Sequence, residues 1–219
     1  MNSNISILQS DPRVLEISNA DSEMSKLIQI IGNIGFELRQ DYFTALTKSI
    51  IGQQLSPKAA ETIYSRFEQL FQNDITPSSL KEIGIEQLRN VGVSKQKISY
   101  LMDLSNNILT KELNLDEISK MDNDQVVKSL TNIKGIGIWT AEMFLIFSLG
   151  KMNILPQNDL ALQRAAKWLY SLDKEADVKS YLLQQSKAWG KNSTIACLYL
   201  WEAVNRDFIK KENIEFLIK

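Results

Sequence analysis

The sequence of 219 residues has no histidine and only one cysteine, Cys197. Catalytic triads that contain histidine, HExxH zinc sites and histidine general bases are therefore excluded. One thiol cannot form an intramolecular disulfide or supply the four thiolates of an iron–sulfur cluster, so we expect a protein of a reducing compartment. Any chemistry in this chain has to depend on carboxylates, lysines, aromatic side chains and backbone groups.

Long hydrophobic runs are also missing. The run 143–149, which includes Ser148, is much shorter than the roughly 18 residues of a membrane span, and the N-terminus lacks the basic and apolar regions of a secretory signal. We therefore expect a soluble intracellular protein without a membrane partner. Because the formal net charge is −1, any binding to nucleic acid has to come from local basic clusters.

Proline is scarce, with four residues in the chain. Three of the prolines follow an Asp, Ser or Thr, in the pairs Asp11-Pro12, Ser56-Pro57 and Thr76-Pro77. Each pair is typical of a helix N-cap followed by proline at the first helical position. No stretch alternates between apolar and polar residues with a period of two, whereas helical spacing is frequent. The predicted fold is all-α, with about ten helices.

Three apolar stripes at helical spacing are expected to face the core. They are Met24, Leu27, Ile28 and Ile31, which end at Gly32; Ala60, Ile63, Tyr64, Phe67, Leu70 and Phe71; and, in a helix that Ser94 opens, Ile98, Leu101, Met102, Ile108 and Leu109.

Charged residues are unevenly distributed along the chain. The segment 111–124 has five acidic residues against two lysines, which indicates a solvated surface. The segments 89–100 and 125–141 contain basic residues and no acid. Both basic segments lie beside turns between predicted helices. Taken alone they fit either ordinary exposed lysines or a nucleic-acid interface.

A glycine-containing turn separates two predicted helices in SLTNIKGIGIWTAEMFLIFSLG. We expect one helix to end near Thr131, a turn at 133–137, and a second helix from Ile138. Gly135 and Gly137 give the turn backbone freedom and allow a close approach. Successive N–H groups before a helix N-terminus attract a phosphate oxygen, although a simple tight connection has the same sequence pattern.

Asp159 lies twenty-two residues after Gly137, in the segment ILPQNDLALQRAAKWLY. Pro156 interrupts the preceding segment, and Asp159 stands where the next helix is predicted to begin. By itself, an aspartate at this place is typical of a helix N-cap.

The motifs together are more specific than each of them alone. KGIGxWTA followed after about twenty residues by LPxxDLAL resembles the helix-hairpin-helix DNA glycosylases, in particular the AlkA-like 3-methyladenine DNA glycosylases. Upstream, SIIGQQLSPKAAETIYSRF is similar to the first signature of that family, and LRNVGVSKQKISYLMDL is similar to the segment between the two signatures. The matches occur in the family's order from about Tyr42 to Tyr170.

The resemblance implies an all-α protein of two helical lobes that share a cleft, with a helix-hairpin-helix motif for DNA. We expect one lobe at 42–154, which contains GQQLS and the hairpin. The second, discontinuous lobe is expected at 1–41 plus 155–219, with the catalytic aspartate. Because the residues before the first signature are predicted to be helical, we expect no counterpart here of the β-rich N-terminal domain of AlkA itself.

The activity implied is hydrolysis of the N-glycosidic bond of alkylated purines, such as 3-methyladenine and 7-methylguanine, in double-stranded DNA. Asp159 matches the catalytic aspartate of the family, and a carboxylate there stabilises the positive charge that develops on the sugar. Glu142 is the other acid nearby, and we expect it at the surface. The enzyme is expected to act as a monomer in base excision repair, in the nucleoid of a prokaryote or the nucleus of a eukaryote.

The resemblance also implies roles in DNA binding. The base pocket is expected to contain Trp139, Met143 and Trp189. Gln54 is the candidate wedge for the space that a flipped base leaves, with Gln53 bonded inside the protein, or the two roles are reversed. The residues expected at the DNA backbone are Ser94, Lys95, Lys97, Lys134, Gly135, Ile136 and Gly137. No cofactor is expected to be required, although the hairpin carbonyls of Ile133 and Ile136 suit a structural Na⁺ or K⁺.

Some positions separate this chain from related branches. Trp139 stands where the lyase-type relatives have a Schiff-base lysine, so we expect a monofunctional enzyme. Met143 stands where AlkA has a second pocket aromatic, and the family's WxPxRS signature is reduced to 189–193, WGKNS. The alternatives are a glycosylase for oxidised or deaminated bases, and a non-catalytic helix-hairpin-helix module that binds DNA.

Overall fold

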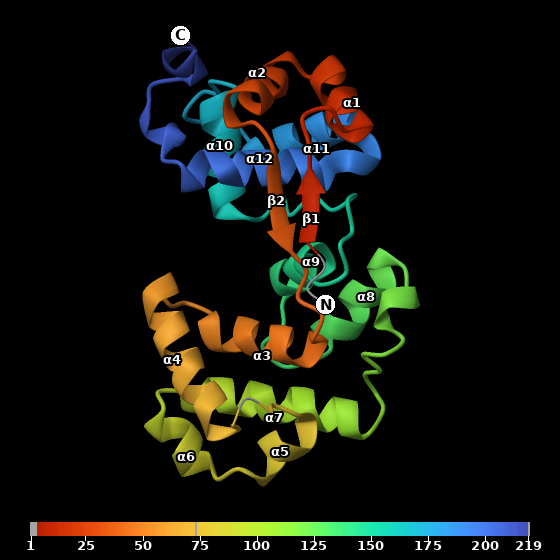
Figure 1. The fold of residues 1–219 in the computed structure, drawn as a ribbon, viewed down its shortest axis with the longest axis vertical. Helices are drawn as coiled ribbons and strands as arrows, with labels where there is room; N and C mark the ends of the chain where they lie inside the picture. Colours follow the sequence, from red (N-terminus) through yellow and green to blue (C-terminus); the bar gives the residue numbers. More distant parts are fainter. Residues whose placement is uncertain (1–3, 73, 219) are drawn as a thin grey trace. The chain divides into compact units, whose positions relative to one another are not determined.

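The computed structural model of the chain describes residues 4–72 and 74–218 (Figure 1). It divides into two compact units. We call Arg39–Leu149 the central unit, and Met1–Leu38 together with Gly150–Lys219 the split unit. The lobe limits predicted from the sequence, 42–154 and 1–41 plus 155–219, differ from these boundaries by a few residues. In the described part of the chain, no helix is long and apolar enough to cross a membrane.

The split unit consists of helices and one small sheet. Its elements are β1 (Asn4–Ile7), α1 (Pro12–Ala20), α2 (Ser22–Ile31), β2 (Ile34–Glu37), α10 (Leu160–Leu169), α11 (Val178–Trp189), α12 (Ser193–Asn205), and the 3₁₀ turns η2 (Gly190–Asn192), η3 (Phe208–Lys210) and η4 (Ile214–Leu217). Helix α12 packs against α2 and α10. Every residue from Asn192 to Leu200 is buried, so the start of α12 forms the centre of this unit.

The sheet corrects the sequence-based expectation of a wholly helical N-terminal segment. Strands β1 and β2 pair antiparallel, with Asn4 opposite Glu37 and Ile7 opposite Ile34, and lie side by side in Figure 1. Each strand has four residues, which is too short for a recognisable alternation. The predicted all-α class is otherwise confirmed.

A buried carboxylate connects the helices of the split unit. Asp21 is 7% exposed. Its Oδ1 accepts the N–H of Met24 at 3.0 Å, and its Oδ2 accepts the Tyr170 hydroxyl at 2.6 Å and the Trp189 indole N–H at 2.9 Å. Burial and the negative charge of Asp21 raise the pKa of Tyr170 far above its ordinary value, so the hydroxyl stays protonated and donates. Asp21 therefore joins α2 to the ends of α10 and α11.

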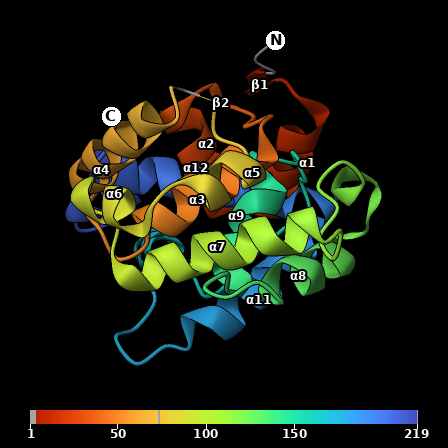
Figure 2. The ribbon, with the colours of Figure 1, turned by 90° about the horizontal axis from the view of Figure 1, so that it is seen from below.

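The regular elements in the described residues of the central unit are all helices, connected by turns and loops. Its elements are α3 (Tyr42–Gly52), α4 (Pro57–Leu70), α5 (Pro77–Glu82), α6 (Ile85–Asn90), α7 (Lys95–Leu109), η1 (Ile118–Lys120), α8 (Asn123–Thr131) and α9 (Ile138–Phe147). Figure 2 shows the long helix α7 beside α5 and α3, and both pairs are in contact. Helices α8 and α9 pack against each other on either side of the predicted hairpin.

The local signals of the sequence are confirmed at the helix N-termini. Asp11, Ser56 and Thr76 each cap a helix that begins with proline, and Ser94 caps α7. The apolar stripe along α2 is buried, but Leu109 in α7 is 45% exposed, contrary to expectation. It is the last residue of its helix, where the neighbours that would cover a stripe end.

Candidate active site and nucleic-acid interface

Asp159 stands at the N-terminus of α10 and is half-buried. Its backbone N–H donates to the carbonyl of Pro156 at 2.9 Å, which closes the turn before the helix. Its Oδ1 accepts the N–H of Leu162 at 2.7 Å and the indole N–H of Trp201 at 3.0 Å. Asp159 is therefore an N-cap, as its position in the sequence indicates, and it is also tied to a second helix.

This arrangement gives a fixed negative charge beside a helix N-terminus. Two N–H donors hold the carboxylate oxygen Oδ1 at the positive end of the α10 helix dipole. A carboxylate held in one orientation stabilises positive charge that develops on a neighbouring group without first having to reorganise. Trp201 was not recognised from the sequence, because nothing in the apolar run of α12 indicates which side chain reaches Asp159.

The predicted hairpin is present between α8 and α9. The N–H of Ile136 donates to the carbonyl of Ile133 at 3.1 Å, and both of these side chains are buried. Gly135 has a φ of +80°. Within the part of the chain that the structure describes, the N–H groups of Gly135 and Gly137 make no hydrogen bond. Open N–H groups just before a helix N-terminus attract an anion such as a phosphate oxygen.

The two glycines of the hairpin have different structural requirements. A Cβ on Gly135 would lie 2.1 Å from Cδ2 of Tyr100, and a side chain is strained at its positive φ. Gly137 has an ordinary φ of −94°, and a Cβ there would have no atom within 4 Å. Gly135 is thus required by the fold, whereas Gly137 leaves open space in front of the hairpin.

This difference gives a paired test. We expect Gly135→Ala to lower the free energy of unfolding by about 1–3 kcal/mol, as overpacking does, and to weaken binding to DNA of any sequence. Gly137→Ala should leave stability unchanged and weaken binding equally for unrelated sequences, because phosphate contacts carry no base information. Urea unfolding and fluorescence anisotropy with two unrelated duplexes measure both effects. Normal binding by both folded variants would mean that the hairpin is a connector.

Lys134 in the hairpin is paired with Asp103, an acidic residue that the sequence motifs did not indicate. Its backbone N–H donates to Oδ2 of Asp103 at 2.9 Å, and its Nζ lies 3.4 Å from Oδ1 of the same residue. Asp103 belongs to α7, so the two residues are thirty-one positions apart. The carboxylate of Asp103 holds the loop in place by accepting the N–H of Lys134. The N–H groups of Gly135 and Gly137 remain available to bind an anion.

The other predicted backbone-binding residues lie at the start of α7. Ser94 is the N-cap and accepts the N–H of Lys97 at 3.3 Å. The ammonium of Lys97 donates to the carbonyl of Ile51 at 2.7 Å, and partial burial lowers its pKa. The ammonium of Lys97 is thus bonded to the protein backbone in this structure, and its expected contact with DNA stays a prediction. Lys95 is exposed and remains a candidate for DNA binding.

A cavity of about 660 Å³ in the central unit brings the two predicted wedge residues, Gln53 and Gln54, together with the predicted pocket residue Trp139, whereas Met143 does not line it. It is lined by Arg39, Lys48, Ser49, Gly52, Gln53, Gln54, Leu55, Ala60, Gly135, Trp139 and Thr140. Trp139 is 44% exposed, which is high for an indole at the start of a helix. The two cationic side chains, Arg39 and Lys48, were not identified from the sequence, because they lie outside the recognised motifs.

The two glutamines at the end of α3 have different environments. Nε2 of Gln53 donates to the carbonyl of Gly135 at 2.8 Å, so this side chain connects α3 to the hairpin. Gln54 is exposed and has a φ of +57°. A left-handed backbone costs energy for a residue other than glycine, and such strain is concentrated at functional sites. The geometry fits the expectation that Gln53 bonds within the protein and Gln54 projects outward.

Trp189 does not fit its predicted role in the base pocket. It is 2% exposed, and its indole N–H is used by Asp21. A side chain that is enclosed in this way offers no ring face to a base, so we assign Trp189 to the core of the split unit.

Met143 is half-buried on α9. Glu142 on the same helix was expected at the surface. It is half-buried instead, and its Oε2 atom is not accessible to solvent, because other parts of the protein cover most faces of α9.

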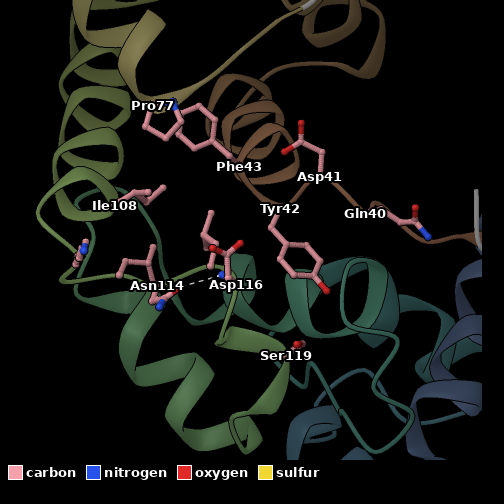
Figure 3. A pocket seen from close by; sticks show the side chains of 12 residues that line it. Gln40, Asp41, Tyr42, Phe43, Pro77, Ile108, Asn114, Asp116 and Ser119 are labelled. Carbon is pink, nitrogen blue, oxygen red and sulfur yellow. Dashed lines mark hydrogen bonds between the residues drawn. The ribbon is translucent and has the colours of Figure 1, made fainter. Parts of the chain in front are cut away.

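A second cavity in the central unit has a different character. Its volume is about 860 Å³, and it lies between the start of α3, the start of α5 and the segment after α7 (Figure 3). Asp41 and Asp116 line it, and the five acids of segment 111–124 are all exposed, as predicted. Carboxylates repel phosphate, so we assign the DNA-binding face to the hairpin and not to this cavity.

The cation proposed at the hairpin stays a prediction. The carbonyl of Ile133, one of its two expected ligands, already accepts the N–H of Ile136 and so also closes the turn. Among the described residues, no group of three or more Cys, Asp or Glu side chains is placed to hold a metal.

Comparison with known proteins gives consistent results. Residues 47–191 match the model of the HhH-GPD superfamily of base excision DNA repair proteins. The chain is 33% identical over 199 residues to DNA-3-methyladenine glycosylase 1 of Schizosaccharomyces pombe, and the match covers 86% of this chain and 85% of that protein.

Solved structures agree with the fold. The crystal structure of DNA-3-methyladenine glycosidase from Bacillus halodurans has a TM-score of 0.89 and 39% identity, with 98% of this chain and 99% of that chain covered. The 3-methyladenine DNA glycosylase of Schizosaccharomyces pombe in complex with abasic DNA has a TM-score of 0.80 and 29% identity, with 88% and 96% covered. Since the family match spans both the hairpin and Asp159, this chain belongs to the HhH-GPD superfamily of base excision DNA repair proteins.

Proposed function

We propose that this protein is a monofunctional DNA glycosylase that removes alkylated purines of the 3-methyladenine and 7-methylguanine class from double-stranded DNA. The observation that carries the proposal is the half-buried carboxylate of Asp159, which is fixed by hydrogen bonds from Leu162 and Trp201. Relatives that are similar over most of the chain are named 3-methyladenine glycosylases. Removal of such bases is the first step of base excision repair.

The chemistry follows from the charge of the substrate. A purine methylated at a ring nitrogen, such as 3-methyladenine or 7-methylguanine in DNA, is already cationic, so the electron pair of the N-glycosidic bond passes to the base without a strong general acid. The deoxyribose is left with positive charge, which the carboxylate of Asp159 stabilises. The same carboxylate orients a water molecule, which adds to the sugar carbon and passes its proton to the carboxylate, from which the proton leaves to solvent. A chain without histidine is suited to this reaction.

DNA recognition divides among the described elements. The N–H groups of Gly135 and Gly137 bind a phosphate, and this contact positions the duplex without reading its sequence. Gln54 fills the space that the flipped base leaves in the stack of DNA bases, while Gln53 stays bonded to the carbonyl of Gly135 in the hairpin. Trp139 offers its exposed ring to the flipped base, and a cationic purine against indole gains a cation–π interaction. We further propose that the protein acts as a monomer.

The decisive experiment is base release from duplex DNA that has been treated with a methylating agent, with chromatographic identification of the free bases. We expect release of 3-methyladenine and 7-methylguanine, and a strand that stays intact until alkali is added. Borohydride should trap no covalent complex, because Trp139 replaces the lysine of lyase-type relatives and the amine of Lys134 lies 3.4 Å from Asp103.

Untreated duplex serves as the control, and defined lesion duplexes separate the alternatives. Release of uracil or an oxidised purine in place of methylated purines would identify a glycosylase for deaminated or oxidised bases. Binding without release of any base would identify a non-catalytic DNA-binding module. Efficient borohydride trapping that a single lysine substitution abolishes would show a bifunctional mechanism.

A further inference from the structure

We propose that Trp201 is a positioning residue for the reaction: its indole N–H sets the orientation of the Asp159 carboxylate. The inference rests on the proposed function of Asp159 and goes beyond it. Nε1 of Trp201 lies 3.0 Å from Oδ1 of Asp159, across forty-two positions of the sequence. Trp201 belongs to α12 and Asp159 caps α10, and these two helices pack directly against each other in the split unit.

The N-cap bond alone does not account for this arrangement. Asp177 caps α11 in the ordinary way, with Oδ1 accepting the N–H of Ser180 at 3.1 Å and Oδ2 accepting the hydroxyl of the same residue at 2.7 Å. Both of these donors lie within one helical turn of Asp177. Asp159 instead receives one donor from its own helix and a second donor from α12, both on Oδ1. Two donors in fixed directions restrict rotation of the carboxylate about its Cβ–Cγ bond.

The scaffold behind the indole is rigid. Residues 192–200, which directly precede Trp201, are all buried, and an indole has only two rotatable side-chain bonds. A donor on such a support holds its acceptor more closely than a flexible lysine or glutamine does. A carboxylate that is preorganised in this way meets the developing charge of the sugar without reorganisation, and a displacement of about 1 Å can cost on the order of 10²-fold in rate.

Other tryptophans of the split unit use their N–H groups differently. Trp168 donates to the backbone carbonyl of Lys211 at 3.1 Å, and Trp189 donates to the buried Asp21. Both bonds hold parts of the fold together. The bond from Trp201 ends on the carboxylate that the superfamily motif places in the active site, so its loss should affect the reaction more than the fold. Trp168 then supplies a matched control, because it lies in the same unit and also loses one indole hydrogen bond when replaced.

The test compares Trp201→Phe with Trp168→Phe and wild type in single-turnover release of 7-methylguanine. We expect Trp201→Phe to lower the rate constant of base release on the order of 10²-fold, with affinity for abasic-site DNA within about twofold of wild type. Trp168→Phe should release the base at the wild-type rate. A site-specific replacement of Trp201 by benzothienylalanine, in which sulfur takes the place of the N–H, keeps the shape of the ring and should reproduce the loss.

The outcomes separate the inference from the proposed function. If wild type releases no methylated base, the proposed function is wrong and the inference is withdrawn with it. If wild type is active and the benzothienylalanine protein retains its rate, Trp201 contributes shape only and the inference alone is overturned. A loss in Trp201→Phe that the benzothienylalanine protein does not share also overturns the inference alone, because the defect then comes from packing.

Discussion

Asp159→Asn should reduce the rate of base release about 10²–10³-fold, the effect of about 3–4 kcal/mol in the barrier when a key electrostatic contact is lost. The side-chain oxygen of asparagine still accepts the N–H groups of Leu162 and Trp201, which now both bond Oδ1. The substitution therefore removes the negative charge and keeps the helix cap. Stability and affinity for abasic-site DNA should stay close to wild type.

Single-turnover release of bases from methylated duplex measures the rate constant, and thermal unfolding measures whether the helix cap still stabilises the protein. Asp177→Asn is the matched control, because it neutralises another N-cap aspartate of the split unit that takes no part in the proposed site. Its rate should equal that of wild type. If Asp159→Asn keeps more than about a tenth of the activity, Asp159 is an N-cap and the proposed chemistry is wrong.

Asp21→Ala should lower the free energy of unfolding by about 3–5 kcal/mol, the range found when one partner of a buried charged network is removed. Three donors lose their acceptor at once: the N–H of Met24, the hydroxyl of Tyr170 and the indole N–H of Trp189. Each buried donor that is left without a partner costs about 1–3 kcal/mol. A loss of this size is a large part of the total stability of an ordinary domain.

Urea unfolding followed by circular dichroism gives the measurement. Asp177→Ala provides the comparison within the same unit, since it removes an exposed cap and should cost only about 1 kcal/mol. Equal losses in the two variants would show that Asp21 is no more than another N-cap. The result also bears on Trp189, because a large loss supports its assignment to the core and not to the base pocket.

Much of the secondary structure was predictable because its signals are local. The caps at Asp11, Ser56 and Thr76 involve an acceptor side chain, a proline and an N–H group within three residues. The hairpin between α8 and α9 was predictable for the same reason, since its glycines and the flanking apolar residues are consecutive in the chain. The strands β1 and β2 were missed, because each has four residues and its partner lies about thirty positions away.

The sequence by itself determined the motifs, the family resemblance and the identity of Asp159 as the residue to test. The tertiary structure decided which side chains serve these motifs. It brought Trp201 to Asp159, Asp103 to the hairpin, and Trp189 to a buried carboxylate instead of a base pocket. The physical reason is that a hydrogen bond between distant positions depends on how whole helices pack. Apolar periodicity indicates which face of a helix is buried, but it does not indicate which polar side chains that packing brings together.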